Sequence, residues 1–390
     1  MDPNSPVTKF GPRACPLPGL SPFELAGAAS LRSGRIPDWP QFAGRSVALT
    51  QSCRTGILLA SEALALATGD EVLVSAYNCG TEVDALLATG LKVRCVDCDA
   101  RGFLTCEALK NAAGPSTRAL YVIHPFGWPQ PLDEIDEWRK ENGILLIEDC
   151  ALALFSEFPD RSPAGSRGEV SIYSFPKTLP TPDGGAISWS TDWAGPGELR
   201  KPPILRTLRP TASVIKRWTR RRLPVRQCAE GPGARLENSA DGEIEDIPED
   251  YYFEPWRARR ACTSLTRRLL SNYDPCAIRK KRRQNYLALS SLLETHGIAL
   301  MYPELPDGVC PLYCPIRVER RDAAVSALAN RGVTTSPWWA GGHRGVEWNR
   351  FPVASGLKRS ILPLPIHHQL CCSDMAYIAD TIRSIYTDFH

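Results

Sequence analysis

The chain has 390 residues, of which 43% are hydrophobic, so it is long enough to bury a large core in one long domain or two lobes. Its formal net charge of +3 favours no particular partner, whether nucleic acid or membrane surface. The 14 cysteines form no paired CxxC array, no apolar run reaches about 18 residues, and no secretory signal is visible. These features predict a cytoplasmic protein with reduced thiols, no metal site and no membrane span.

Residues 1–40 are rich in proline and predict an irregular N-terminal arm with one helix near 22–32. Beyond the arm, apolar strand patterns alternate with amphipathic helix patterns. The expected strands are 47–50, 71–76, 92–97, 119–124 and 144–147, and the expected helices are 57–66, 82–89, 105–113 and 133–142. This alternation is typical of an α/β fold with right-handed crossovers and a mostly parallel sheet.

A change of charge marks the next segment. Residues 199–227 contain ten basic side chains and no acid, whereas residues 230–254 contain nine acids and one arginine. We predict a solvated charged insertion or linker over 199–254. A basic flap over a phosphorylated substrate is the alternative. Nucleic-acid binding is not favoured, because Trp218 is the only aromatic residue in the basic run.

The C-terminal part, residues 255–390, predicts a smaller α+β lobe. Its expected helices are 257–270, 276–295, 321–330 and 373–386, and its expected strands are 312–318 and 333–336. The loop 337–344 contains Trp338, Trp339, His343 and Arg344, which are side chains able to contact a substrate. The two tryptophans are at least as well explained as residues that close the lobe.

One acid and one lysine are candidate catalytic residues. Asp149 follows the unbroken apolar run 144–147, and ligands of open α/β sheets bind just beyond the carboxyl ends of such strands. Lys177 lies 28 residues further on among apolar and proline residues, so we expect its pKa to be lowered. A neutral amine can form a Schiff base, and pyridoxal 5′-phosphate (PLP) uses a lysine with an acidic partner. By themselves, however, the two residues are better explained as a helix cap and a surface lysine.

An ordered set of motifs makes the argument specific. The chain resembles the DegT/StrS sugar aminotransferases, a family of fold-type I PLP enzymes. The resemblance rests on Ser52-Cys53-Arg54-Thr55, Gly69-Asp70-Glu71-Val72, Glu148-Asp149-Cys150-Ala151, Ser174-Phe175-Pro176-Lys177 and Gly184-Gly185. It implies a three-layer α/β large domain over residues 41–198 that binds PLP, with a smaller α+β C-terminal lobe.

The resemblance also implies roles for individual residues. Lys177 would hold PLP and move a proton during the reaction, and Asp149 would keep the ring nitrogen protonated. The phosphate candidates are Ser52, Arg54, Thr55 and Ser174. Tyr77 would take the place of the aromatic residue that stacks on the ring, although a role in the core is equally expected. The implied acceptor is a keto group of a nucleotide-linked sugar, with glutamate as donor, in a homodimer.

Three departures from the family pattern keep alternatives open. Leu152 stands where the family commonly has a glutamine, and the interval from Ser174 to Lys177 is two residues shorter than usual. The asparagine that the family's partner subunit contributes has no counterpart in residues 251–254. A PLP lyase or dehydratase on the same scaffold, or a non-catalytic relative, therefore remains an alternative.

Overall fold

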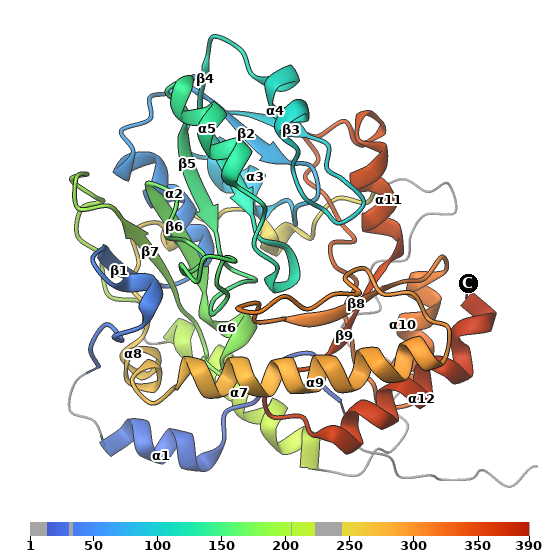
Figure 1. The fold of residues 1–390 in the computed structure, drawn as a ribbon. Coiled ribbons are helices and arrows are strands. Elements are labelled where there is room, and N and C mark those ends of the chain that lie inside the picture. Colours follow the sequence, from blue (N-terminus) through green and yellow to red (C-terminus); the bar gives the residue numbers. More distant parts are fainter. Residues whose placement is uncertain (1–13, 31–33, 204, 223–243, 390) are drawn as a thin grey trace, which may run out of the picture.

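The computed structural model describes residues 14–30, 34–203, 205–222 and 244–389 (Figure 1). A seven-stranded sheet in the order β1-β7-β6-β5-β4-β2-β3 forms its centre. The strands are β1 (Ser46–Thr50), β2 (Glu71–Ser75), β3 (Lys92–Val96), β4 (Thr117–Ile123), β5 (Leu145–Asp149), β6 (Val170–Ser174) and β7 (Gly185–Trp189). Strands β2 to β6 are parallel, and β7 runs antiparallel to both β6 and β1. The prediction of an α/β fold with a mostly parallel sheet is confirmed.

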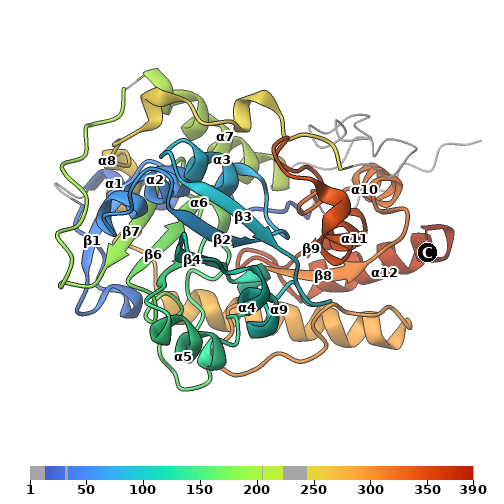
Figure 2. The same cartoon turned by 90° about the horizontal axis from the view of Figure 1, so that it is seen from above.

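Helices cover both faces of this sheet. They include α2 (Cys53–Ala63), α3 (Thr81–Leu87), α4 (Cys106–Ala112) and α5 (Asp133–Glu141). Figure 2 shows α4 and α5 on one side of the sheet and α2 and α3 on the other. Side chains alternate across a strand, so in β2 Val72 and Val74 join one apolar cluster while Leu73 joins the other. The three layers place the carboxyl ends of the parallel strands at one edge of the sheet.

The smaller lobe is built on the antiparallel pair β8 (Tyr313–Arg317) and β9 (Ile361–Pro365). Its helices are α9 (Pro275–Thr295), α10 (Arg321–Asn330), α11 (Pro352–Ser360) and α12 (Cys372–Phe389), and Figure 1 shows α9 running below both lobes. The strand predicted over 333–336 is wrong. Val333 forms only one bridge, to Ala14 of the arm, and Pro337 lacks the N–H group needed to continue a ladder.

The helix predicted over 257–270 is wrong in its first half. The turn η4 (Pro255–Arg257) is followed by extended chain along β1, where Cys262 N–H donates to Leu49 O at 3.2 Å. The helix α8 (Ser264–Leu270) begins only after Thr263, whose hydroxyl accepts from Thr266 N–H. Strand β1 is the edge of the sheet, and its unpaired backbone groups bind this segment in preference to a helix.

The charged segment also differs from the prediction of a solvated insertion. Residues 205–222 form helix α7 (Leu205–Arg222), which buries Val214 against Leu20 and Leu269. An apolar stripe on the basic helix explains this packing. Helix α1 (Pro22–Ser30) confirms the helix expected in the arm. Residues 223–243 lie outside the described residues, and the division of the chain at 40, 198 and 254 stays a prediction.

Short 3-10 turns complete the secondary structure. They are η1 (Pro40–Phe42), η2 (Pro125–Gly127), η3 (Glu249–Tyr251) and η5 (Trp348–Arg350). Among the helices that the structure describes, none combines the length and apolar character needed to cross a bilayer.

Candidate active site

Asp149 is the last residue of β5, at the carboxyl edge of the sheet. Its Oδ2 accepts a 2.6 Å hydrogen bond from the Tyr121 hydroxyl on β4, and its Oδ1 accepts from Ala151 N–H at 2.8 Å. The pKa of Asp149 is raised, because burial and the nearby Glu82 outweigh the opposing effects of Lys177 and Tyr121. A cation beside this carboxylate therefore stabilises its ionised form.

Lys177 lies on the one-turn helix α6 (Phe175–Thr178), which follows β6 directly. Its Nζ is 5.2 Å from the centroid of the Trp338 ring. The expectation of a lowered pKa is wrong. Burial does lower the pKa of Lys177, but Cys79, Asp149, Cys53 and Glu82 together raise it above its ordinary value. Of these, the carboxylates supply the negative charge at neutral pH, since burial raises the pKa of Cys79 to about 12.

Ser52 caps α2, where its Oγ accepts from Thr55 N–H at 3.3 Å. The predicted Gly184-Gly185 pair explains why this turn can lie beside the end of β6. A Cβ on Gly185 would be 2.5 Å from Tyr173 O and 2.9 Å from Cys53 N. Only a glycine allows that approach, which brings Ser52 into the same region as Ser174.

Arg54 and Thr55, the other phosphate candidates on this turn, contact a distant segment. Arg54 Nη1 donates to Tyr251 O at 2.6 Å, and Thr55 Oγ1 donates to Arg257 O at 3.2 Å. Both side chains thus hold residues 251–257 against the first turn of α2.

A cavity of about 540 Å³ opens at this turn. It is lined by Gln51, Ser52, Ser174, Pro176, Pro182, Asp183, Gly184, Arg209, Pro210, Trp256 and Arg257. Two of the predicted phosphate residues, Ser52 and Ser174, therefore face one space, and the Ser174 hydroxyl makes no capping hydrogen bond to α6. Sequence reasoning missed Arg209 and Arg257, because no motif links them to Ser52.

Tyr77 is almost fully buried, with 1% of its surface exposed. Its hydroxyl donates to Trp338 O at 3.0 Å, and its ring meets that of Trp339 edge-on, with 4.7 Å between centroids. Tyr77 thus supports the loop that carries Trp338, and it is Trp338 whose ring lies next to Lys177.

Glu82 is a second buried carboxylate that sequence reasoning missed. It lies in the first turn of α3 and accepts hydrogen bonds from the backbone N–H and the thiol of Cys79, at 3.2 and 2.9 Å. It contributes to the raised pKa values of both Asp149 and Lys177. Its neighbours in the sequence, Thr81 and Val83, give no signal of this role.

His124, Glu148 and Cys150 form a buried cluster with the spacing of metal ligands. The Glu148 oxygens accept N–H bonds from Gly165, Arg167 and Gly168 and pair with His124 at 3.0 Å. These four bonds occupy the carboxylate, so the cluster fixes the loop before β6 and is not suited to a cation.

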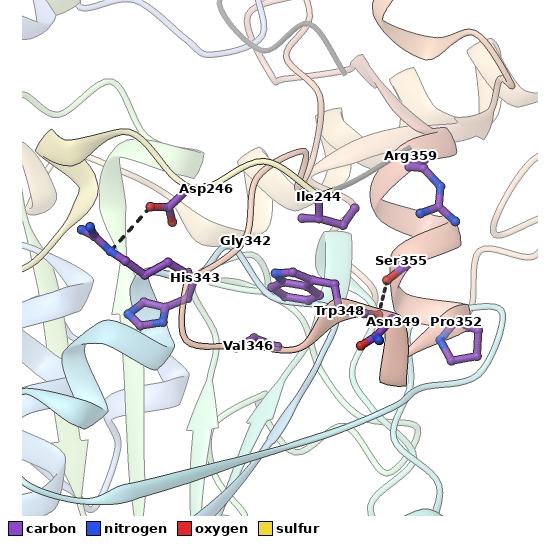
Figure 3. Close-up of a pocket in the computed structure, with 11 residues that line it drawn as sticks. Ile244, Asp246, Gly342, His343, Val346, Trp348, Asn349, Pro352, Ser355 and Arg359 are labelled. Atoms are coloured by element: carbon purple, nitrogen blue, oxygen red, sulfur yellow. Dashed lines mark hydrogen bonds and ion pairs between the residues drawn. The ribbon is translucent and has the colours of Figure 1, made fainter. Parts of the chain in front are cut away.

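A second cavity of about 620 Å³ is lined by residues 244–246, the loop 342–349 and helix α11 (Figure 3). Ile244, Trp348 and Arg359 surround it, and Arg344 at its rim pairs with Asp246 at 3.5 Å. It shares no lining residue with the cavity at Ser52.

The side chains at the sheet edge fit PLP, the cofactor that the resemblance implies. PLP presents an aldehyde, a ring nitrogen and a phosphate. The Lys177 amine suits the aldehyde, the Asp149 carboxylate suits a protonated ring nitrogen, and Ser52 and Ser174 offer hydroxyl groups to the phosphate. Leu152, where the family commonly has glutamine, is buried in the apolar core.

Comparison with known proteins supports the same assignment. A UDP-N-acetyl-3-dehydro-alpha-D-glucosamine 3-aminotransferase from Acidithiobacillus ferrooxidans is 26% identical over 85% of this chain and 82% of its own length. A dTDP-4-dehydro-2,3,6-trideoxy-D-glucose 4-aminotransferase from Saccharopolyspora spinosa is 25% identical over 86% of this chain and 83% of its own length.

Solved structures share the fold. The aminotransferase TlmJ from Streptoalloteichus hindustanus is 23% identical, with a TM-score of 0.67 over 96% of this chain and 98% of its own. The Streptococcus pneumoniae protein Spr1654 in its PLP form is 17% identical, with a TM-score of 0.70 over 97% and 99% of the two chains. Residues 40–193 match the family model itself. Over these residues the chain is similar to the DegT/DnrJ/EryC1/StrS aminotransferase family, and the two curated aminotransferases resemble it over most of its length.

Proposed function

We propose that this PLP-dependent aminotransferase transfers the amino group of glutamate to a keto group of a nucleotide-linked sugar. The placement of Lys177 carries the proposal, because this lysine lies beside the carboxylate of Asp149 at the carboxyl edge of a fold-type I sheet. The curated relatives are named for transfer to UDP- and dTDP-linked sugars, which supports the acceptor class.

Each side chain has a distinct task in this reaction. When bound, PLP supplies an electron sink for the carbon next to the amine. With PLP bound, Lys177 Nζ would be the acid–base group that moves a proton at the donor carbon. Asp149 would hold the protonated ring nitrogen, and the hydrogen bond from the Tyr121 hydroxyl orients its carboxylate. Trp338 covers Lys177 and limits the access of water.

Glutamate alone should convert bound PLP to its pyridoxamine form and release 2-oxoglutarate in equal amount. Absorption spectra of the purified protein, with the keto acid assayed in parallel, check this; glutamine and other amino acids are tested next. Release of ammonia or an eliminated fragment, with the aldehyde form regenerated without a keto acceptor, would instead support a lyase. A protein that binds no PLP would support a non-catalytic relative.

We further propose a homodimer in the cytoplasm. The family resemblance motivates the dimer, and large apolar side chains such as Phe23 on α1 and Leu208 on α7 are exposed by 85% and 59%. Free thiols at all the described cysteines fit a reducing compartment.

Sedimentation should give twice the 43.0 kDa chain mass for the active species. Phe23→Ser and Leu208→Ser should weaken association, whereas Leu287→Ser, at an exposed position on α9, should not. Full activity in a species that sediments as one chain would contradict the dimer.

A further inference from the structure

We propose that Arg257 and Arg209 form, with Ser52 and Ser174, a cradle that holds the cofactor phosphate within one chain. These four side chains line the 540 Å³ cavity at the first turn of α2. The inference rests on the proposed function, and it adds two arginines that no motif of the sequence indicates. One of them comes from the charged segment whose role the sequence left open.

Arg257 is held in position by the turn that caps α2. Thr55 Oγ1 donates to Arg257 O at 3.2 Å, and Arg54 Nη1 donates to Tyr251 O at 2.6 Å. The segment 251–257 is therefore attached to the α2 turn at two points. Arg54 and Thr55 would act on the phosphate through this segment, whereas Arg257 itself lines the cavity.

The positive charge near this cavity exceeds what the neighbouring acids balance. Arg257 Nε donates to Glu254 at 2.7 Å, but this pair is half exposed and is screened by water. Its planar guanidinium keeps further N–H groups for an anion. The pKa of Arg54 is lowered by burial and then by repulsion from Arg257. A dianion beside the two groups would relieve this repulsion.

Arg209 approaches the same cavity from α7. Within the part of the chain that the structure describes, no ion pair joins it to an acid, and it is exposed. Asp183 is the one acid among the described lining residues. Its carboxylate accepts from Thr263 Oγ1 at 2.9 Å and from Thr266 Oγ1, and burial raises its pKa. The lining therefore favours a phosphate over a neutral ligand.

The two arginines supply the positive charge that an anion-binding site at the α2 turn requires. The turn offers backbone N–H groups and the Ser52 hydroxyl, which favour an anion at a helix N-terminus. Its two remaining polar side chains, Arg54 and Thr55, are occupied by the 251–257 segment. Neither Arg54 nor Thr55 lines the cavity, so guanidinium charge in the lining comes from Arg257 and Arg209.

The test compares binding of PLP with binding of pyridoxal, which lacks the phosphate, by absorbance titration of cofactor-free protein. Arg257→Ala should weaken PLP binding by about 10- to 100-fold, the usual effect of losing a hydrogen bond to a charged group. Arg209→Ala, at an exposed site, should weaken it by up to about fivefold. Neither variant should change pyridoxal binding, and Arg257→Lys should restore part of the PLP affinity.

Matched controls are Arg259→Ala, two residues from Arg257, and Arg220→Ala, on the exposed face of α7. Both should bind PLP like the parent chain, and inorganic phosphate should compete with PLP only while Arg257 is present. Equal losses for PLP and pyridoxal, or no loss for either, would overturn the cradle while leaving the aminotransferase intact. Weaker binding of UDP with normal PLP binding would reassign the cradle to a substrate phosphate. A parent chain that binds no PLP would overturn the proposed function instead.

Discussion

Lys177→Ala should abolish the covalent attachment of PLP and lower the transfer rate by about 10²- to 10⁴-fold, the usual contribution of a positioned acid–base group. The lysine supplies an amine at the carboxyl edge of the sheet, near Asp149 and beside the Trp338 ring. Borohydride reduction followed by peptide mapping locates the modified lysine. The parent chain should carry the label on Lys177, and the variant should carry none.

Lys140→Ala is the matched control, because Lys140 lies on the exposed face of α5, with 64% of its side chain exposed. It should keep both the label and the activity. A Lys177→Ala protein that gives the same reduced lysine adduct as the parent would show that another residue holds the cofactor. Binding of PLP without covalent attachment is compatible with the assignment, since the phosphate cradle remains.

Asp149→Asn should keep bound PLP but lower the rate by about 10- to 1000-fold. An opposite charge within about 4–6 Å shifts a pKa by about one to three units, and an amide supplies no such charge to hold the ring proton. The hydrogen bonds from Tyr121 and Ala151 reach one oxygen each, so the amide would also lose one acceptor. The loss should appear in kcat at saturating donor, with the cofactor content unchanged.

Asp192→Asn is the control, since Asp192 lies in an exposed turn, where its carboxylate accepts from the Ser190 hydroxyl at 3.0 Å. It should behave like the parent chain. Activity of Asp149→Asn within a few-fold of the parent would exclude Asp149 from partnering the ring nitrogen, and the buried carboxylate of Glu82 would then be the next residue to test.

The direction in which the pKa of Lys177 is shifted could not be predicted from its sequence neighbours. Phe175, Pro176 and Leu179 predict a lowered pKa for Lys177, because local apolar residues disfavour the charged form. Glu82 from α3 and Asp149 from β5 reach the same place, and their charge reverses the direction. Long-range approach of charges depends on the sheet order, which no local pattern encodes.

The order of the motifs and the hydrophobic periodicity were enough to predict much of the fold and part of the candidate site. They predicted the alternating elements of the large domain, the position of Asp149 at the end of a strand, and the family whose model matches residues 40–193. Such features are local, since a strand or helix is set by side-chain periods within about ten residues. Ser52 and Ser174 came from the same motifs, and their placement at one cavity follows from the close approach that Gly185 permits.

Only the tertiary structure decided which other side chains lie at the cavity beside Ser52 and Ser174. Arg54 and Thr55 bind the backbone of residues 251–257, about 200 residues away, and this brings Arg257 to the cavity. Arg209 arrives on α7 because that helix buries Val214 against α1 and α8. The extended chain before α8 likewise forms because the edge of β1 offers unpaired backbone groups. Each outcome depends on contacts between segments far apart in the chain, whose free energies no local sequence pattern contains.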